Sequence, residues 1–410
     1  MPAPAFYHFR LSLSSKGYYS HLARLCTELI LCKMAQTVCQ NNLIEYDKRL
    51  VKRGEARRFC FSLKYWIFPV KKQSTFDPTT SQNIVHVIAP ARLHLGFIDM
   101  HGGMGRSFGS LGLCLADIYT HISVTGSDSV FIQGPSSHRA SIYAGRILEH
   151  LGIPTGVNIT IHEAIPEHAG LGSGTQLSLA VGTAIAMVYG YNISGEELAE
   201  VMGRGTRSGI GIGAFSRGGF LVDGGRGNES GVPPIICQLP FPDAWRFVLV
   251  FDSGHQGMHG IGEMRAFENL QPMSETMSGR LCRLTLMQAL PALVEEDCEH
   301  FGASISQIQM LVGDHFAPLQ GGRYTSQGVA QVLSRLQDLG ATGIGQSSWG
   351  PTGFALFAHE TQAFQALRQV REQWIHDPRL LFRLCRARNQ KAEVRLEQVE
   401  SGMNLKLKSF

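Results

Sequence analysis

Short apolar runs, several of them with a polar residue at every second position, follow one another from residue 84 toward the C-terminus. Runs of this length that are rich in β-branched and aromatic residues are typical of strands. We therefore expect strands at residues 85–89, 93–97, 118–124, 130–133, 157–162, 247–251 and 353–357.

Apolar residues three and four positions apart predict helices between these strands. Residues 137–151 form one such segment, whose expected core face is Ile142, Ile147, Leu148 and Leu151. Residues 173–189 are apolar on nearly every side and include no charged residue, which predicts a buried helix. Ser194 followed by Glu197 has the pattern of a helix N-cap with a capping box. Further helices are expected at residues 278–295, 300–316, 327–339 and 361–374.

Strands and helices are mixed without a regular strand–helix–strand spacing, which favours an α+β fold of two domains over one doubly wound sheet. Residues 224–242 contain Gly, Asn, Ser and four prolines and are the expected linker. We therefore expect one domain at 84–235 and a second at 236–410.

Residues 1–83 differ in composition from the rest of the chain, with 13 Lys and Arg against 5 Asp and Glu and only two of the 46 glycines. A helix is expected at residues 19–40. The segment is interpreted as a poorly ordered basic extension or as the product of an upstream translation start. A membrane- or partner-binding arm is the alternative.

The remaining residues carry 24 Lys and Arg against 28 Asp and Glu, a mildly acidic balance that argues against nucleic-acid binding. No apolar run reaches the ~20 residues of a membrane span. The nine cysteines are an odd number without a Cys-x-x-Cys pair, which favours reduced thiols and neither disulfides nor zinc. We expect a cytoplasmic protein that acts on small molecules, and a homodimer is left open.

The clearest chemical motif is Ile-Pro-Glu-His-Ala-Gly-Leu-Gly-Ser-Gly-Thr-Gln at residues 165–176. It joins an expected strand to the start of the apolar helix, where backbone N–H groups carry about half a positive charge. Glycines let an oxyanion approach such a backbone closely. The motif is neither a Walker loop, since no Lys follows the glycines, nor a dinucleotide-binding turn. Its expected phosphate-binding residues are Gly170, Gly172, Ser173, Gly174, Thr175 and Gln176, and a structural turn is the alternative.

This motif resembles the central phosphate loop of the GHMP superfamily, which includes galactokinase, homoserine kinase and mevalonate kinase. Residues 89–96 and 343–353 resemble the N-terminal and C-terminal motifs of the same superfamily. The resemblance covers roughly residues 84–400. It implies an N-terminal domain similar to domain 2 of ribosomal protein S5 and a ferredoxin-like C-terminal domain.

Five segments resemble one branch of the superfamily, the β-ribofuranosylaminobenzene 5′-phosphate synthase family. They are residues 92–100, 102–106, 206–211, 218–220 and 346–352. The resemblance implies a pentosyltransferase of tetrahydromethanopterin biosynthesis that condenses phosphoribosyl pyrophosphate with 4-aminobenzoate or 4-hydroxybenzoate. Carbon dioxide and pyrophosphate are the implied by-products, and Mg²⁺ is the implied cofactor.

Two alternatives are an ATP-dependent GHMP kinase and a non-catalytic protein that binds a phosphorylated metabolite. Three departures from the kinase pattern argue against ATP. Gly174 replaces the usual second Ser, Arg92 replaces a common Lys, and residues 347–349 replace a run of small residues. An acidic phosphoribosyl-pyrophosphate motif is not recognisable in the sequence. This observation argues against phosphoribosyl pyrophosphate as the substrate.

Arg92, His94, Asp99 and Arg207 are the candidate catalytic residues. Arg92 and His94 are two positions apart on one expected strand and therefore share a face, where they can hold a carboxylate or phosphate. The alternative interpretation is that Arg92 lies on the surface and His94 belongs to the core. Asp99 is a candidate for binding Mg²⁺ or ribose hydroxyls, or for capping a turn. Arg106 and Arg207 lie in glycine-rich segments as candidate phosphate ligands, with a surface position as the alternative.

The C-terminal motif supplies the candidate substrate-binding residues Ser347, Ser348, Trp349, Gly350 and Thr352. Trp349 is either part of a slot for the aromatic acid or a core residue. Asp223, Asp252 and His255 follow expected strands and are weaker candidates. No spacing predicts a dedicated metal site, so any Mg²⁺ is expected to be held largely by pyrophosphate with one or two carboxylates.

Overall fold

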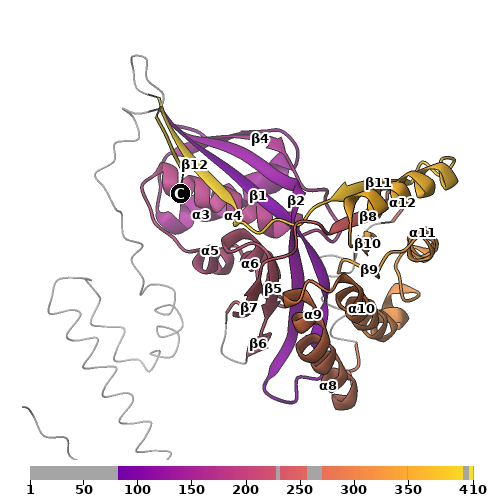
Figure 1. The fold of residues 1–410 in the computed structure, drawn as a ribbon. Coiled ribbons are helices and arrows are strands. Elements are labelled where there is room, and N and C mark those ends of the chain that lie inside the picture. Colours follow the sequence, from indigo (N-terminus) through magenta and orange to yellow (C-terminus); the bar gives the residue numbers. More distant parts are fainter. Residues whose placement is uncertain (1–81, 228–230, 256–269, 349, 400–405, 410) are drawn as a thin grey trace, which may run out of the picture. The chain divides into compact units, whose positions relative to one another are not determined.

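The computed structural model describes residues 82–227, 231–255, 270–348, 350–399 and 406–409. The expected extension 1–83 and its helix therefore lie almost wholly outside the described residues. The described chain forms two sheets with helices packed against them (Figure 1), which is the α+β class that the sequence predicts.

The larger sheet has nine strands, with a main path in the order β13-β12-β1-β2-β4-β3. On its second branch β5 and β6 pair with β2, and β7 pairs with β5. Only β3 and β4 pair in parallel. The strands are β1 (Gln82–Asp99), β2 (Arg106–Ser127), β3 (Phe131–Gln133), β4 (Gly156–Glu163), β5 (Phe220–Asp223), β6 (Arg226–Gly227), β7 (Ile235–Leu239), β12 (Glu393–Val399) and β13 (Lys406–Ser409).

The central hairpin of β1 and β2 is longer than the sequence pattern predicts. The expected strands 85–89 and 93–97 are two parts of β1, and 118–124 is only the second half of β2. The pairing register shifts between Pro90 and Arg92 and again between His94 and Gly96. Irregularities of this kind bend a strand and re-aim its side chains. Arg92 and His94 therefore stand where β1 departs from regular pairing.

Two helices, α3 (Ser137–Leu151) and α4 (Ser173–Val188), cover one face of the larger sheet (Figure 1). Both expected helices are confirmed, and α4 is buried along most of its length. The expected place of Ile142 in the core is wrong, since its side chain is 45% exposed. The small side chains of α3 bring it close to the sheet, and its core face is Ala140, Tyr143, Ala144, Ile147, Leu148 and Leu151. Ser194 caps α5 (Gly195–Val201) with the expected capping box.

The smaller sheet has the strand order β11-β8-β10-β9, and all of its pairs are antiparallel. Val248 and Val250 of β8, one of its two inner strands, pack toward α11 and α12. Phe247 and Leu249 of the same strand face the core that α10 shares with the larger sheet. The elements are β8 (Arg246–Asp252), β9 (Gly343–Gln346), β10 (Gly353–Phe357), β11 (Leu380–Cys385), α10 (Cys298–Gln320), α11 (Gln327–Asp338) and α12 (Glu360–Gln373).

Two further expectations differ from the structure. The expected linker 224–242 contains β6, which pairs with β2, and β7, whose apolar residues extend the sheet beside β5. The expected helix 278–295 consists of α8 (Glu275–Leu284), the π-helical turn η2 (Thr285–Ala289) and α9 (Leu290–Val294). The larger sheet also draws strands from both expected domains, since β12 and β13 pair beside β1.

The five cysteines of the described residues, at positions 114, 237, 282, 298 and 385, are free thiols. Within the same residues, no helix combines the length and the apolar character that crossing a membrane requires.

Candidate functional site

The glycine-rich motif forms a loop from β4 to the first turn of α4. Gly170 and Gly172 have φ angles of 75° and 84°, in the left-handed region that favours glycine. Gly172 is the N-cap residue, and no side chain caps the helix. The first turn has no acidic residue, although acidic residues are favoured there. The helix start therefore offers backbone N–H groups and a positive dipole end to an anion.

The three glycine-rich or basic motifs of the sequence meet at this loop. The backbone N–H of Arg92 donates to the carbonyl of Leu171 at 3.1 Å, and the Arg92 guanidinium donates to the carbonyl of Gly170. Ser347 donates from its hydroxyl to the same carbonyl of Gly170 at 2.8 Å and accepts from the backbone N–H of His94 at 3.0 Å. Segments 89–96, 165–176 and 343–353 thus form one hydrogen-bonded unit.

Glycines allow the segments of this unit to approach one another closely. A Cβ atom on Gly170 would overlap the carbonyl oxygen of Ser347, and one on Gly350 would lie 2.5 Å from the backbone of Ala169. A Cβ on Gly172 would lie 3.2 Å from Cγ of Arg92. At Gly170 and Gly350 only glycine fits without displacing the backbone, and at Gly172 the positive φ angle favours glycine.

Two arginines that the sequence analysis did not select lie over the first turn of α4. A Cβ atom on Gly174 would lie 2.7 Å from Nη2 of Arg139 and 3.3 Å from Nη1 of Arg204. Arg139 belongs to α3, and Arg204 follows α5. The two guanidinium groups and the N-terminus of α4 therefore concentrate positive charge around Gly174. The side chain that the kinase motif carries here would compete with Arg139 for space.

The charge of Arg204 is not neutralised by a carboxylate among the described residues. Its guanidinium donates to the hydroxyl of Tyr143 and lies over the ring, with Cζ 5.3 Å from the ring centroid. Its Nε atom is buried without a hydrogen-bond partner in the described part of the chain. Burial and the charges of Arg139 and Arg146 lower the pKa of Arg204. Arg204 is half-buried, and a cation that is partly removed from water without a counter-charge is costly, so this position favours an anionic ligand.

Arg139 has a partial counter-charge, because its Nη1 lies 3.0 Å from Oε1 of Glu167. Glu167 also accepts from the hydroxyl of Ser136 at 2.5 Å. Burial acts to raise the pKa of Glu167, but the hydrogen bonds of Ser136 and Arg139 outweigh it and lower the pKa. One carboxylate therefore faces two arginines and a helix N-terminus, and the site as a whole remains positive.

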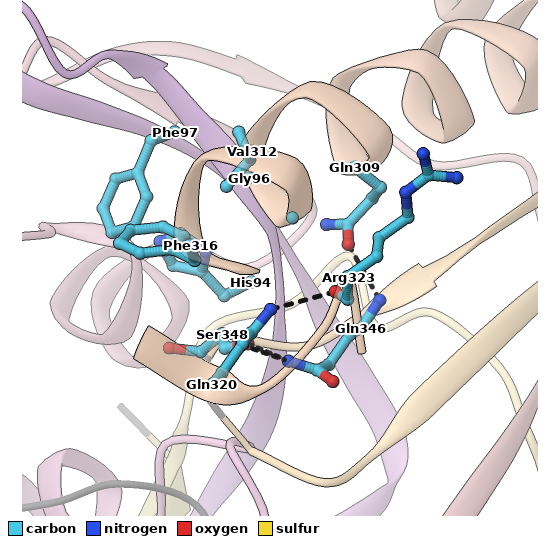
Figure 2. A pocket seen from close by; sticks show the side chains of 11 residues that line it. His94, Gly96, Phe97, Gln309, Val312, Phe316, Gln320, Arg323, Gln346 and Ser348 are labelled. Atoms are coloured by element: carbon cyan, nitrogen blue, oxygen red, sulfur yellow. Dashed lines mark hydrogen bonds between the residues drawn. The ribbon is translucent and has the colours of Figure 1, made fainter. Parts of the chain in front are cut away.

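His94 lines a small cavity between β1 and α10. Figure 2 shows His94 and Phe97 of β1 facing Phe316 of α10, with Gln346 and Ser348 at the edge. The rings of His94 and Phe97 lie 4.7 Å apart, and His94 Nε2 is buried without a hydrogen-bond partner among the described residues. Burial, with a smaller effect of Arg92, lowers the pKa of His94 to about 3. The imidazole is therefore neutral at physiological pH and suited to hydrogen bonding rather than to carrying charge.

The remaining candidates are the catalytic residues Asp99 and Arg207 and the phosphate ligand Arg106, and each has its own place in the structure. Asp99 accepts from the N–H groups of His101 and Gly102 at 2.8 and 3.2 Å and so caps a turn. Arg106 donates to the carbonyls of residues 224 and 225, and no hydrogen bond or ion pair joins it to the 165–176 loop. Arg207 lies between α5 and α6 (Ile210–Ser216), and α6 packs against the first turn of α4 at Gly211.

The candidate loop residues divide into two groups. Ser173, Gly174 and Thr175 are partly exposed at the start of α4. Gln176 is buried, and its amide donates to the carbonyl of Gly211 at 2.7 Å, so it fixes α6 against α4.

The candidates in the C-terminal motif also divide. Ser347 joins the three segments, and Ser348 borders the cavity with a positive φ of 56°. Gly350 packs on the loop, and Thr352 is fully buried with its hydroxyl unpartnered among the described residues. Trp349 lies outside the described residues.

The weaker candidates have structural partners. Asp223 is fully buried and accepts from the N–H groups of Gly209 and Gly225 at 2.8 and 2.9 Å. Burial raises its pKa, although these hydrogen bonds oppose the shift. Asp252 accepts from the hydroxyl of Ser326 at 2.6 Å and pairs with His255. These contacts order the loops around the sheets.

Comparison with known proteins agrees with this geometry. Family models described as the N-terminal and C-terminal domains of GHMP kinases match residues 140–219 and 289–376. A homoserine kinase from Cytophaga hutchinsonii matches with a TM-score of 0.53 and 18% identity, over 80% of this chain and 100% of that chain. The mevalonate kinase of Methanococcus jannaschii matches with a TM-score of 0.54 and 13% identity, over 74% and 98%. The protein therefore has the two-domain fold of the GHMP kinases.

Sequence relatives identify the branch. The β-ribofuranosylphenol 5′-phosphate synthase of Archaeoglobus fulgidus is 36% identical over 281 residues, covering 65% of this chain and 86% of that protein. The synthase of the same name from Methanocaldococcus jannaschii is 34% identical over 297 residues, covering 65% and 87%. A 4-diphosphocytidyl-2-C-methyl-D-erythritol kinase from Levilactobacillus brevis is 24% identical over 286 residues. This chain belongs to the β-ribofuranosylphenol 5′-phosphate synthase family of transferases.

Proposed function

We propose that this protein transfers the 5-phosphoribosyl group of phosphoribosyl pyrophosphate to an aromatic acid, with release of carbon dioxide and pyrophosphate, in tetrahydromethanopterin biosynthesis. The observation that carries the proposal is the positive site at the start of α4. There Arg204, which has no carboxylate partner among the described residues, and Arg139, which pairs with Glu167, lie beside the N-terminus of α4. No side chain caps this helix end. The relatives' shared name indicates a ribosyl phosphate product, which supports the same assignment.

The pyrophosphate group of the donor fits the positive site. It leaves with the electrons of the bond to ribose C1, so its negative charge grows as the reaction proceeds. Cations and helix N–H groups fixed in advance stabilise such a developing charge without reorganising. Arg92 borders the loop through the carbonyl of Gly170, which suits it to the donor's ribose or phosphate.

The aromatic acid fits on the side of His94. The neutral imidazole has an unpartnered Nε2 next to the ring of Phe97. A ring with a hydroxyl or amino group and an apolar body matches this combination of one polar atom and aromatic surface. The relatives' name specifies a phenol and thus favours 4-hydroxybenzoate over 4-aminobenzoate as the acceptor.

The proposed reaction balances without an added acid or base. The ring carbon that bears the carboxylate attacks ribose C1, and the bond from C1 to pyrophosphate breaks. The ring then recovers its aromatic electrons as the bond to the carboxylate breaks and carbon dioxide leaves. Positioning and electrostatics therefore dominate, which is consistent with a histidine whose pKa is far below neutrality.

Mg²⁺ remains part of the proposal through the family resemblance. The carboxylate that lies in the loop itself is Glu167. Glu167 is engaged with Arg139 and Ser136, and Asp223 is held by the N–H groups of residues 209 and 225. No group of three potential metal ligands lies at the loop in the described part of the chain. Glu167 is the carboxylate that could join pyrophosphate oxygens around Mg²⁺, which would neutralise the leaving group.

The test is incubation of the purified protein with phosphoribosyl pyrophosphate and carboxyl-labelled 4-hydroxybenzoate or 4-aminobenzoate. We expect labelled carbon dioxide and pyrophosphate in equal amounts, and only when both substrates are present. Pyrophosphate without carbon dioxide would contradict the proposed transfer. Formation of ADP from ATP with an alcohol substrate would instead establish the kinase alternative. Binding of phosphoribosyl pyrophosphate without any product would establish a non-catalytic binding protein.

A further inference from the structure

Three histidines gather on the larger sheet, on the face opposite α3 and α4. Val85, Ile122 and Ile161 point into the core under those helices. Their sequence neighbours His86, His121 and His162 therefore project from the other face of β1, β2 and β4. Their potential ligand nitrogens all lie within 4.8 Å of one another. Within the described residues, no other group of three or more His, Cys, Asp or Glu side chains brings its ligand atoms this close together.

The strand pairing explains how residues far apart in sequence meet here. His121 stands opposite Ile88, two positions from His86 on the same face of β1. On the other side of β2, the register shifts between His121 and Ile122 where they face β4. This bulge brings His162 beside His121, and their ring centroids lie 4.5 Å apart.

A carboxylate from a fourth strand lies beside one of these three histidines. Nε2 of His86 lies 3.2 Å from Oε2 of Glu397 on β12. Zinc–ligand bonds of about 2.0–2.1 Å in a tetrahedron place neighbouring ligand atoms about 3.4 Å apart, so this pair already has the required spacing. Nε2 of His162 lies 2.9 Å from the hydroxyl of Ser123, a contact that a metal ion would replace or use through the other ring nitrogen.

We propose that His86, His121 and His162 bind one divalent transition-metal ion, of which Zn²⁺ is the best match, and that the carboxylate of Glu397 turns from His86 toward the ion as the fourth ligand. Imidazole nitrogens suit Zn²⁺, Co²⁺, Ni²⁺ and Cu²⁺ and not Mg²⁺, which prefers oxygen ligands. Burial and the two neighbouring histidines lower the pKa of His121, which favours the neutral form that binds metal. The nearby Arg395 pairs with Glu393, which limits its repulsion of a cation.

The role of this ion is structural. A four-ligand site without an open position is typical of zinc that holds a fold together. It would join β12, which comes from the C-terminal end of the chain, to β1, β2 and β4. Arg92 and His94 lie further along β1, so the site is separate from the candidate active site and does not depend on the proposed function.

The test uses the full chain without a histidine tag, stripped of metal with a chelator and titrated with Co²⁺. We expect one Co²⁺ per chain with the intense visible absorption of tetrahedral coordination, and its displacement by Zn²⁺. The variants His121→Ala and His162→Ala should bind at least tenfold more weakly and lose this absorption. The matched control His150→Ala removes an exposed histidine of α3 and should bind like the wild type.

Equal Co²⁺ affinity and absorption in the wild type and both cluster variants would overturn the proposal, as would absence of the absorption in the wild type. Circular dichroism establishes that each variant is folded. His162 is exposed, so its replacement keeps the test valid if His121→Ala does not fold. Zinc should also raise the melting temperature of the wild type and leave that of His162→Ala unchanged.

Discussion

Replacing Arg204 with methionine separates the proposed anion site from ordinary structural packing. The side chain makes one hydrogen bond to Tyr143, lies on its ring, and leaves Nε buried without a partner. Methionine keeps much of the apolar contact and removes the half-buried charge. We therefore expect little loss of stability in the free protein, because the desolvation cost of an unpaired cation disappears with the lost hydrogen bond.

Binding of phosphoribosyl pyrophosphate, in contrast to stability, should change strongly. A hydrogen bond to a charged group contributes about 1.5–3 kcal/mol, and about 1.4 kcal/mol corresponds to a tenfold change in affinity. Arg204→Met should therefore weaken binding of phosphoribosyl pyrophosphate by about 10- to 150-fold. Isothermal titration calorimetry measures the affinity, and urea denaturation of the free protein measures the stability.

Arg146→Met is the matched control. Arg146 belongs to the same group of cations, but its guanidinium donates to the carbonyl of Met202 and is not among the atoms nearest Gly174. Its replacement should leave the affinity within a few-fold of the wild type. A role of Arg204 in anion binding is excluded if Arg204→Met binds phosphoribosyl pyrophosphate as tightly as the wild type, or if both variants weaken binding equally.

Three further predictions concern the same site. Gly174→Ser, which restores the kinase residue, should displace Arg139 and weaken pyrophosphate binding without unfolding the protein; unchanged binding by calorimetry would contradict the contact at 2.7 Å. Ser347→Ala leaves the N–H of His94 and the carbonyl of Gly170 with one partner fewer, and should lower the free energy of unfolding in urea by about 1–3 kcal/mol. An unchanged free energy of unfolding would argue against the three-segment unit. Because the folded-state pKa of His94 is about 3, below its unfolded value, its neutral form contributes stability that is lost as pH falls from about 6.5 toward 3. His94→Gln should therefore flatten the pH dependence of unfolding there, by at most about 1.4 kcal/mol per pH unit, whereas an identical slope would show that His94 does not titrate in this way.

Local patterns in the sequence were enough for the regular elements. The bounds of α3 and β10 match the expected ranges, since their apolar spacing has few competing interpretations. The first half of β2 was missed because Gly109 and Gly112 give it the composition of a loop, although Gly112 lies in close contact with Ile210. The pairing of β12 with β1 is a contact across the whole chain, which local periodicity does not encode.

The candidate site was only partly predictable for a related reason. Arg92, Ser347 and Gly170 are each marked by a local motif, and the structure brings them together. Arg139 and Arg204 carry no such mark, because a charged residue on an amphipathic helix or in a loop has the pattern of a surface residue. Gly174 was a usable signal: the missing side chain at this position leaves room for a group from elsewhere, and that group is the guanidinium of Arg139.

The proposed function depends on whether the start of α4, with Arg139 and Arg204, holds the pyrophosphate of a phosphorylated sugar. A crystal structure of the protein with phosphoribosyl pyrophosphate decides this. We expect the two phosphates within hydrogen-bond distance of the N–H groups at residues 173 and 174 and of both guanidinium groups. Pyrophosphate density elsewhere on the molecule, with this site unchanged, would contradict it.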